Sequence, residues 1–165
     1  GGRRAHPPKG ERIFALSLNK KERQKAIRSA IAATIDKIYL EDKGIKVTEN
    51  LPLIVEKLED VNKTKEIKEL LQKLNLTPEL ERADNKKIRA GKGTMRGRKY
   101  RKVKGPLIVV ASNDSKVYKS GRNLAGFEIT EVSSLNTELL APGAEPGRFI
   151  IWSLNSIPCI LSKSS

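Results

Sequence analysis

Residues 86–104 include ten lysine or arginine residues and no acidic residue. Uncompensated cations at this density repel one another, so this segment cannot enter a hydrophobic core and should be extended in the free chain. A polyphosphate partner would order it, because binding releases the counterions that are condensed on the phosphates. A chain of 165 residues is expected to form one domain, whose core must therefore come from the residues on either side.

The rest of the excess charge lies at the amino-terminal end. The net charge of the chain is +14, and residues 1–28 supply nine lysine or arginine residues against two acids, a net charge of +7. Residues 29–85 hold nine cations against twelve acids, and residues 105–165 hold five of each. A solvated basic face is the alternative explanation of the second basic segment, but such a face would intersperse Glu and Asp. The charge distribution favours two dedicated polyanion-binding segments.

Within the second segment, small residues alternate with cations. Glycine lets the backbone approach a phosphate chain closely, arginine can grip phosphates or stack on bases, and Tyr100 offers one stacking face. A nuclear-localisation signal would not need the glycines, so we predict contacts with RNA. The residues predicted to make them are Lys86, Lys87, Arg89, Lys92, Arg96, Arg98, Lys99, Tyr100, Arg101, Lys102 and Lys104.

Outside these segments, helical and strand patterns alternate. A capping box of Asn19 and Glu22 predicts a helix over 20–40, and helices should begin near Thr64 and at Thr77-Pro78, the latter running toward Ile88. The apolar run 107–111 is typical of a strand buried on both faces of a parallel sheet. Further strands are expected at 51–55, 127–130 and 148–152, and further helical segments at 115–124 and 136–140. This alternation predicts an α/β layer fold.

No catalytic, metal or cofactor site can be assembled from the sequence. The run Gly91-Lys92-Gly93-Thr94 lacks the upstream glycine of a phosphate-binding loop, and residues 143–147 do not have the spacing of a dinucleotide fingerprint. His6 has no nearby acid to orient it as a base, and the acids of the middle region are expected in surface ion pairs. We expect no enzyme activity and no small-molecule substrate.

Cysteine usage and hydropathy suggest the compartment. The single Cys159 cannot form an internal disulfide, and we expect it to be a small buried residue. No run approaches the apolar length of a membrane-spanning helix, and the amino-terminal end lacks a secretory pattern. We expect a cytosolic protein without a membrane partner, and the opening Gly1-Gly2 suggests a processed or fragmentary amino-terminal end.

Several ordered blocks of the chain resemble one family. They are residues 1–9 (GGRRAHPPK), 19–23 (NKKER), 26–34 (AIRSAIAAT), 87–101, 122–126 (RNLAG) and 140–148 (LAPGAEPGR). In order and spacing, these blocks resemble the archaeal and eukaryotic branch of the ribosomal protein L-four family of the large subunit. The absence of the long eukaryotic extension favours an archaeal source.

The resemblance implies a three-layer α/β/α domain with a mainly parallel, Rossmann-like sheet and basic extended segments. It assigns residues 1–12 to the returning limb of a loop that lines the peptide exit tunnel, and 13–153 to one domain with an rRNA-binding insertion at 86–104. Residues 154–165 would be a carboxyl-terminal tail, and Pro158 predicts less helix there than the family's ending has. Contacts of the first limb with large-subunit rRNA are implied for Arg3, Arg4, His6, Lys9 and Arg12.

The resemblance also implies binding partners, and it shows which segments of the family this chain does not match. Neighbouring large-subunit proteins, the nascent peptide and a role in cytoplasmic translation are expected, whereas the family's amino-terminal strands and the outgoing limb of its loop are not found in this chain.

Two other functional classes of protein remain open. A chromatin-type module would bind other nucleic acid, although no helix has a basic face at groove spacing, and an RNA-processing enzyme would need catalytic groups that we do not find.

Overall fold

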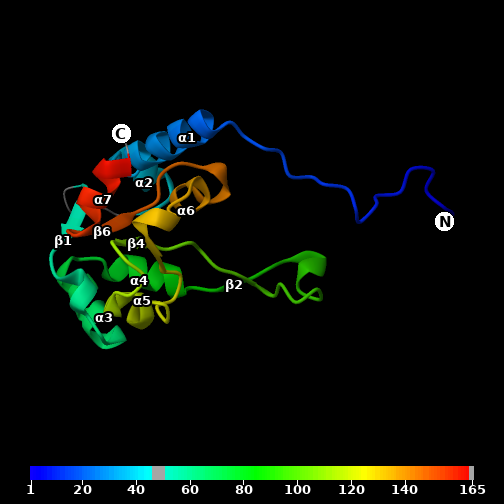
Figure 1. The fold of residues 1–165 in the computed structure, drawn as a ribbon. Coiled ribbons are helices and arrows are strands. Elements are labelled where there is room, and N and C mark those ends of the chain that lie inside the picture. The colour runs from blue at the N-terminus through cyan, green and yellow to red at the C-terminus, as the bar shows by residue number, and fades with distance from the viewer. Residues whose placement is uncertain (46–50, 164–165) are drawn as a thin grey trace.

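The computed structural model describes residues 1–45 and 51–163, which form an α/β body from which two segments protrude. The amino-terminal residues before α1 (Lys20–Ala33) form one protrusion, and the segment between α4 (Thr77–Asp84) and β4 (Leu107–Val110) forms the other. Figure 1 shows both on the same side of the body. The body therefore carries the two basic segments outside its core.

A parallel sheet lies at the centre of the body. Its strands are β1 (Leu53–Val55), β6 (Ile150–Ser153), β4 and β5 (Glu128–Glu131), in the order β1-β6-β4-β5. All three strand pairs are parallel. Every residue of the inner strands β4 and β6 is buried. The prediction that the apolar run 107–111 forms a strand covered on both faces is confirmed by β4. β1 is an edge strand, the position that the preceding Pro52 favours.

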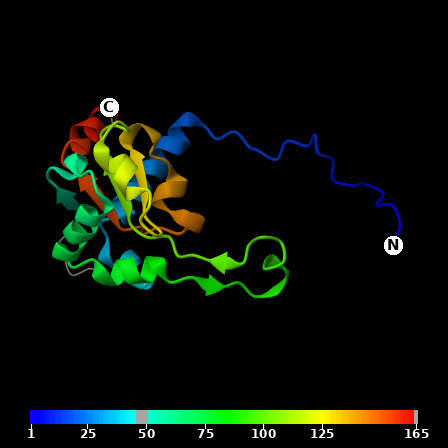
Figure 2. The same ribbon diagram turned by 90° about the horizontal axis from the view of Figure 1, so that it is seen from below.

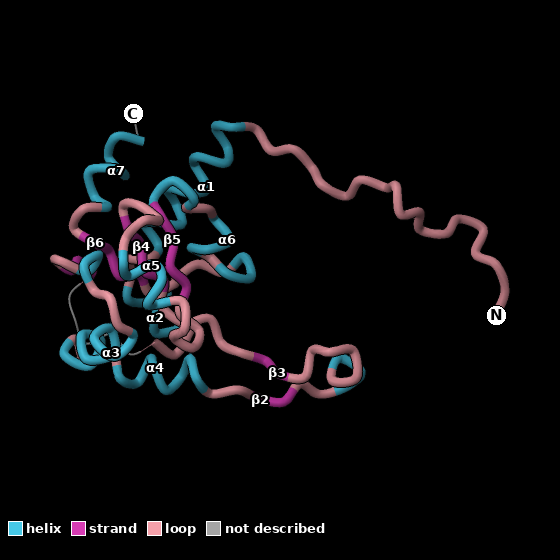
Figure 3. The backbone as a smooth tube through the Cα atoms, turned by 60° about the horizontal axis from the view of Figure 1, so that its bottom comes forward, coloured by secondary structure: helices cyan, strands magenta, loops and turns pink. Residues whose placement is uncertain are grey.

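Helices cover both faces of this sheet, because alternate side chains of each strand point to opposite sides. Ile108, Val110 and Ile151 join one buried cluster with side chains of α2 (Lys37–Asp42), α3 (Thr64–Lys73), α4 and α5 (Lys116–Gly121). Leu107, Val109, Ile150 and Trp152 join a second cluster, against which α1, α6 (Thr137–Leu140) and α7 (Ser156–Lys163) pack. The three-layer α/β/α prediction is confirmed, as Figure 3 shows.

The helix predicted over 20–40 is in fact two helices. α1 ends at Ala33, where the Thr34 hydroxyl donates to the Ile31 carbonyl oxygen at 2.6 Å. Asp36 then begins α2 by accepting a hydrogen bond from the Ile38 amide at 3.0 Å. Short polar side chains of this kind compete for backbone groups and favour helix ends. The predicted capping box is also wrong, because the Asn19 side chain makes no capping hydrogen bond.

Of two other predicted helix boundaries, one is confirmed and one is wrong. α3 begins at Thr64 as predicted, with Lys63 in the cap position, where its backbone amide donates to the Glu66 carboxylate. α4 ends at Asp84 instead of running toward Ile88, which belongs to a strand. Between α3 and α4, Asn75 has a φ of +55°, a left-handed conformation that asparagine tolerates and that does not continue a helix.

The carboxyl-terminal tail is more helical than Pro158 suggested, because α7 covers residues 156–163. Pro158 lies in the first turn of α7, where its missing N–H would have had no helical partner. Ile160 packs against the second cluster, and Cys159 is exposed. The prediction of a buried cysteine is therefore wrong. None of the helices in the described ranges combines the length and apolar character that crossing a membrane requires.

Within residues 1–45 and 51–163, short 3₁₀ turns lie at Leu58–Asp60, Gly91–Gly93, Val132–Ser134 and Pro142–Ala144. In the first turn, the Glu59 carboxylate accepts hydrogen bonds from the Ala111 amide at 2.9 Å and from the Ser153 hydroxyl at 2.7 Å. A third comes from the Asn155 side-chain amide at 3.3 Å. Glu59 thus joins the carboxyl ends of β4 and β6, and it is not the surface ion pair predicted for acids of this region.

The hydrogen bonds of Glu59 make the free energy of unfolding depend on pH in the acidic range. Burial raises the pKa of Glu59, but the hydrogen bonds from Ala111, Ser153 and Asn155 outweigh it, so the folded-state pKa lies below the ordinary value of 4.5. A lowered pKa means that this stabilisation is complete above pH 4.5 and is lost as the pH falls through the folded-state value. We expect the free energy of unfolding to fall less on acidification in Glu59→Gln than in the unmodified chain.

Urea unfolding at a series of pH values below 6 measures this difference. Glu69→Gln is the matched control, because Glu69 is exposed on α3 and carries no such set of hydrogen bonds. Equal acid dependence of the Glu59→Gln variant and the unmodified chain would contradict the assignment.

Candidate nucleic-acid interface

The segment 86–104 forms a protruding hairpin. β2 (Lys87–Ile88) pairs antiparallel with β3 (Tyr100–Arg101), and the Arg89 amide extends the ladder by donating to the Lys99 carbonyl oxygen at 2.8 Å. Figure 2 shows the hairpin leading away from the sheet and its helices. The segment extends away from the body, as expected for a chain of repelling cations. Its two limbs are nevertheless held together by backbone hydrogen bonds, which the sequence did not predict.

The tip of the hairpin is a closed turn. The Thr94 and Arg96 amides donate to the carbonyl oxygens of Gly91 and Gly93, and the Arg98 amide also donates to Gly93, at 3.0 Å. Gly97 has a φ of +74°, a conformation that glycine adopts without the steric cost of a side chain. The glycines therefore serve the turn itself, whereas the close approach to phosphate that the sequence suggested for them stays a prediction.

Arg89 differs from the other cations of the hairpin. Its Nε donates to the Arg98 carbonyl oxygen at 3.2 Å, and its backbone oxygen accepts from the Thr94 hydroxyl at 2.6 Å. A Cβ atom on Gly93 would lie 2.8 Å from Arg89 Cδ, so the arginine stem passes directly beside this glycine. Arg89 thus links the two limbs of the tip, a structural role that the sequence did not indicate.

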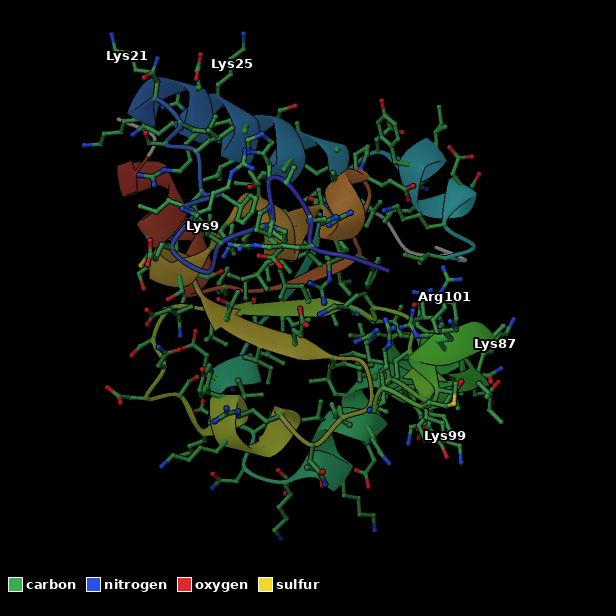
Figure 4. All side chains as sticks on the ribbon, turned by 90° about the vertical axis from the view of Figure 1, so that its right-hand side faces the viewer. Lys9, Lys21, Lys25, Lys87, Lys99 and Arg101 are labelled. Carbon is green, nitrogen blue, oxygen red and sulfur yellow. The ribbon has the colours of Figure 1, made fainter. Side chains whose placement is uncertain are left out.

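All ten cations of the hairpin are exposed. Lys99 Nζ lies 5.5 Å from the centre of the Tyr100 ring, and Lys87 and Arg101 face each other across the ladder. Figure 4 looks toward the protrusions and shows these cations around the hairpin. With no acid between residues 86 and 104, the hairpin presents a concentrated positive field to solvent.

Ion pairs anchor the base of the hairpin to the body. Glu128 on β5 binds Lys104 on one side and, at 2.8 Å, Arg148 on the other. Arg148 is only 3% exposed, and it also donates to the carbonyl oxygens of Gly105 at 3.0 Å and Leu139 at 2.7 Å. Lys104, predicted to contact RNA, is therefore partly neutralised by Glu128. Burial raises the pKa of Glu128, but hydrogen bonds and charge from Lys104 and Arg148 lower it overall.

The other limb of the hairpin leaves from α4, where Glu79 is buried. Its carboxylate receives two parallel bonds from Arg82, Nε to Oε1 at 2.9 Å and Nη2 to Oε2 at 2.8 Å. Arg82 Nη2 also donates to the Lys104 carbonyl oxygen at 3.3 Å. The prediction that acids of the middle region form surface ion pairs is wrong for Glu79, which is buried and pairs with an arginine that also bonds the carboxyl-side end of the hairpin at Lys104.

The amino-terminal arm, residues 1–19, is extended and all of its residues are exposed. A turn closes where the Arg12 amide donates to the Lys9 carbonyl oxygen at 3.2 Å, and the Arg12 guanidinium lies 5.1 Å from the centre of the Phe14 ring. The extended path continues to α1 at Lys20. The remaining predicted residues of the arm, Arg3, Arg4 and His6, make no side-chain hydrogen bond or ion pair that the structure describes.

Comparison with known proteins identifies the family. Residues 1–162 match the model of the ribosomal protein L4/L1 family. The chain belongs to this family. It is 49% identical over 162 residues to the large ribosomal subunit protein uL4 of Nanoarchaeum equitans, and that alignment covers 98% of this chain and 60% of the relative.

Two further archaeal relatives carry the same name. The identity is 45% over 161 residues with the protein of Methanosphaera stadtmanae, covering 95% of this chain and 62% of the relative. It is 44% over 159 residues with that of Archaeoglobus fulgidus, covering 95% and 63%. The resemblance inferred from the ordered blocks is confirmed, and the chain spans about three fifths of the length of these relatives.

The structure adds cations of α1 that were not among the predicted contact residues. Lys20, Lys21, Arg23 and Lys25 are exposed on α1, directly after the arm, and Figure 4 shows Lys21 and Lys25 pointing away from the body. The charge count of residues 1–28 already contained this signal. It was not assigned to individual residues, because one helix face must pack against the sheet and the sequence alone leaves open which lysines remain outside.

The described residues contain no group of three or more His, Cys, Asp or Glu side chains that could hold a metal ion. The run Gly91 to Thr94 lies at the hairpin tip, whereas a nucleotide-binding loop of the kind its sequence suggests connects a strand to a helix. The exposed cations of the arm and the hairpin favour a polyanionic ligand.

Proposed function

We propose that this chain is a structural constituent of the large ribosomal subunit, which binds large-subunit rRNA through the hairpin 86–104 and the arm 1–19. The observation that supports this most strongly is that the two acid-poor segments of the chain protrude from the same side of the body (Figures 1 and 2). The names of the relatives point to the same particle.

The distribution of charge supports different roles for the body and the two protrusions. The hairpin has a net charge of +10, and the arm has four cations and one acid, whereas residues 29–85 are mildly acidic and residues 105–165 are neutral. Phosphate contacts orient a protein on nucleic acid, and counterion release drives the binding. In the proposed arrangement the body docks on the outside of the RNA while the protrusions enter it and stabilise its fold.

The arm has the form that such entry requires. Its residues are exposed and extended, so they can follow a narrow RNA passage without unfolding the body. By resemblance to the family, we propose that residues 1–12 contribute to the wall of the peptide exit tunnel. In this role the chain supports translation in the cytoplasm beside neighbouring large-subunit proteins, as a scaffold and not as an enzyme.

Hydroxyl-radical footprinting of the chain on large-subunit rRNA tests the proposal. We expect discrete protected regions, and a variant lacking residues 1–12 should lose only part of them. Competition with duplex DNA provides the discriminating control. Protection of duplex DNA in preference to rRNA, or no protection of large-subunit rRNA, would instead favour a chromatin-type or other nucleic-acid module.

A further inference from the structure

The hairpin has two chemically different faces. In an antiparallel pair, residues directly opposite each other project to the same face, and the next pair projects to the other. Lys87 is opposite Arg101, and Ile88 is opposite Tyr100. One face of the ladder is therefore cationic, and the other carries an isoleucine and an aromatic ring, whose Cβ atoms are expected to lie about 5 Å apart.

The apolar pair is not covered by the body. The side chains of Ile88 and Tyr100 are 69% and 50% exposed. Scattered apolar residues are common on protein surfaces, but this pair lies on a ribbon of two residues per strand, surrounded by cations, where it adds nothing to a core. Its position makes it available to a ligand that the surrounding charge attracts.

We propose that Ile88 and Tyr100 form a stacking site for an unpaired RNA base, while Lys87 and Arg101 on the opposite face bind phosphates. This inference rests on the proposed function and narrows its ligand to RNA with unpaired nucleotides. Bases within a duplex are already stacked and paired, whereas the bases of single strands, bulges and loops can stack on aromatic side chains. A flat ring beside a branched aliphatic chain provides such a surface.

Lys99 supports this assignment. Its ammonium group lies over one face of the Tyr100 ring, 5.5 Å from the ring centre, so a base would stack on the opposite face. A base stacked on Tyr100 brings its own phosphate into this region, so that Lys99 can neutralise the phosphate. The ring thus selects unpaired nucleotides, and the surrounding cations supply most of the affinity.

The test compares two RNAs with equal numbers of phosphates, an oligoadenylate of about twelve nucleotides and a fully paired duplex. Tyr100→Val removes the ring and keeps a β-branched residue that suits the strand, and Tyr100→Phe keeps the ring. We expect Tyr100→Val to weaken binding of oligoadenylate by about 5- to 100-fold, with little change for the duplex. Tyr100→Phe should bind both RNAs like the unmodified chain, and the salt dependence should be unchanged, because no cation is removed.

Each other outcome has a distinct meaning. Equal losses on the two RNAs, or no loss on either, would overturn the stacking site and leave the proposed function intact. Unchanged RNA binding by Tyr100→Val together with impaired association with large-subunit proteins would show that a protein covers this face. If the unmodified chain bound neither RNA nor large-subunit rRNA, the proposed function itself would fail. Thermal unfolding of each variant checks that the body is intact.

Discussion

Replacing Arg96, Arg98 and Arg101 together by glutamine should lower the slope of log affinity against log salt concentration by about two to three units. Each of these arginines is exposed on the hairpin, and each contact with a phosphate releases about one counterion. A fourfold increase in salt should then weaken RNA binding by the unmodified chain about 15- to 60-fold more than binding by the variant. Filter binding to large-subunit rRNA over a salt series measures both slopes.

The matched control replaces Lys65, Lys68 and Lys73 by glutamine. These lysines are also exposed, but they lie on α3, on the side of the body away from the hairpin (Figures 1 and 3). The two variants have the same net charge, so a general effect of charge would lower both slopes equally. An unchanged slope in the arginine variant would remove these three residues from the interface.

Replacing Arg148 by methionine should destabilise the body by about 3 kcal/mol. The buried guanidinium donates to the carbonyl oxygens of Gly105 and Leu139 and pairs with Glu128, and methionine can replace its packing but none of these bonds. Gly105 leads into β4, and Glu128 also binds Lys104 at the base of the hairpin. The variant should therefore bind rRNA more weakly without a change in the salt-dependence slope.

Urea unfolding and RNA binding together check this prediction. Lys104→Met is the control, because Lys104 is 57% exposed on its side chain and an exposed ion pair contributes only about 0–1 kcal/mol. A loss of stability in Arg148→Met no larger than that in Lys104→Met would show that the buried arginine does not hold the base of the hairpin. A decreased salt slope would instead assign Arg148 a direct phosphate contact.

Local features of the molecule could be predicted because they depend on residues that are near each other in the chain. The absence of acids between residues 86 and 104 keeps this segment out of any core, whatever the rest of the chain does. The continuous apolar run at β4 requires cover on both faces, and the structure places it inside the parallel sheet between two layers of helices. The ordered family blocks were likewise sufficient to identify the family.

Other features could not be predicted in the same way, because the same local residues fit more than one structure. The break between α1 and α2 depends on which nearby backbone groups Thr34 and Asp36 bind, and the sequence does not decide this, although both residues suit a helix end. Cys159 looked like a core residue, but the phase of α7 against the sheet turns Ile160 inward and leaves the cysteine outside. Helical periodicity shows which residues share a face, but only packing selects the buried face.

The charge of the hairpin was thus evident from composition, because repulsion among neighbouring cations does not depend on the fold. The shape of the hairpin and its attachment to the body were not evident from composition. Glu128 and Arg148 lie 20 residues apart and both bind near the base of the hairpin, and Lys104, 24 residues before Glu128, completes the ion-pair network. Such pairings form only when the folded sheet brings β5, the residues before β6 and the base of the hairpin close together in space. Local charge and hydropathy therefore predict what must be exposed, whereas long-range hydrogen bonds and packing determine where it is held.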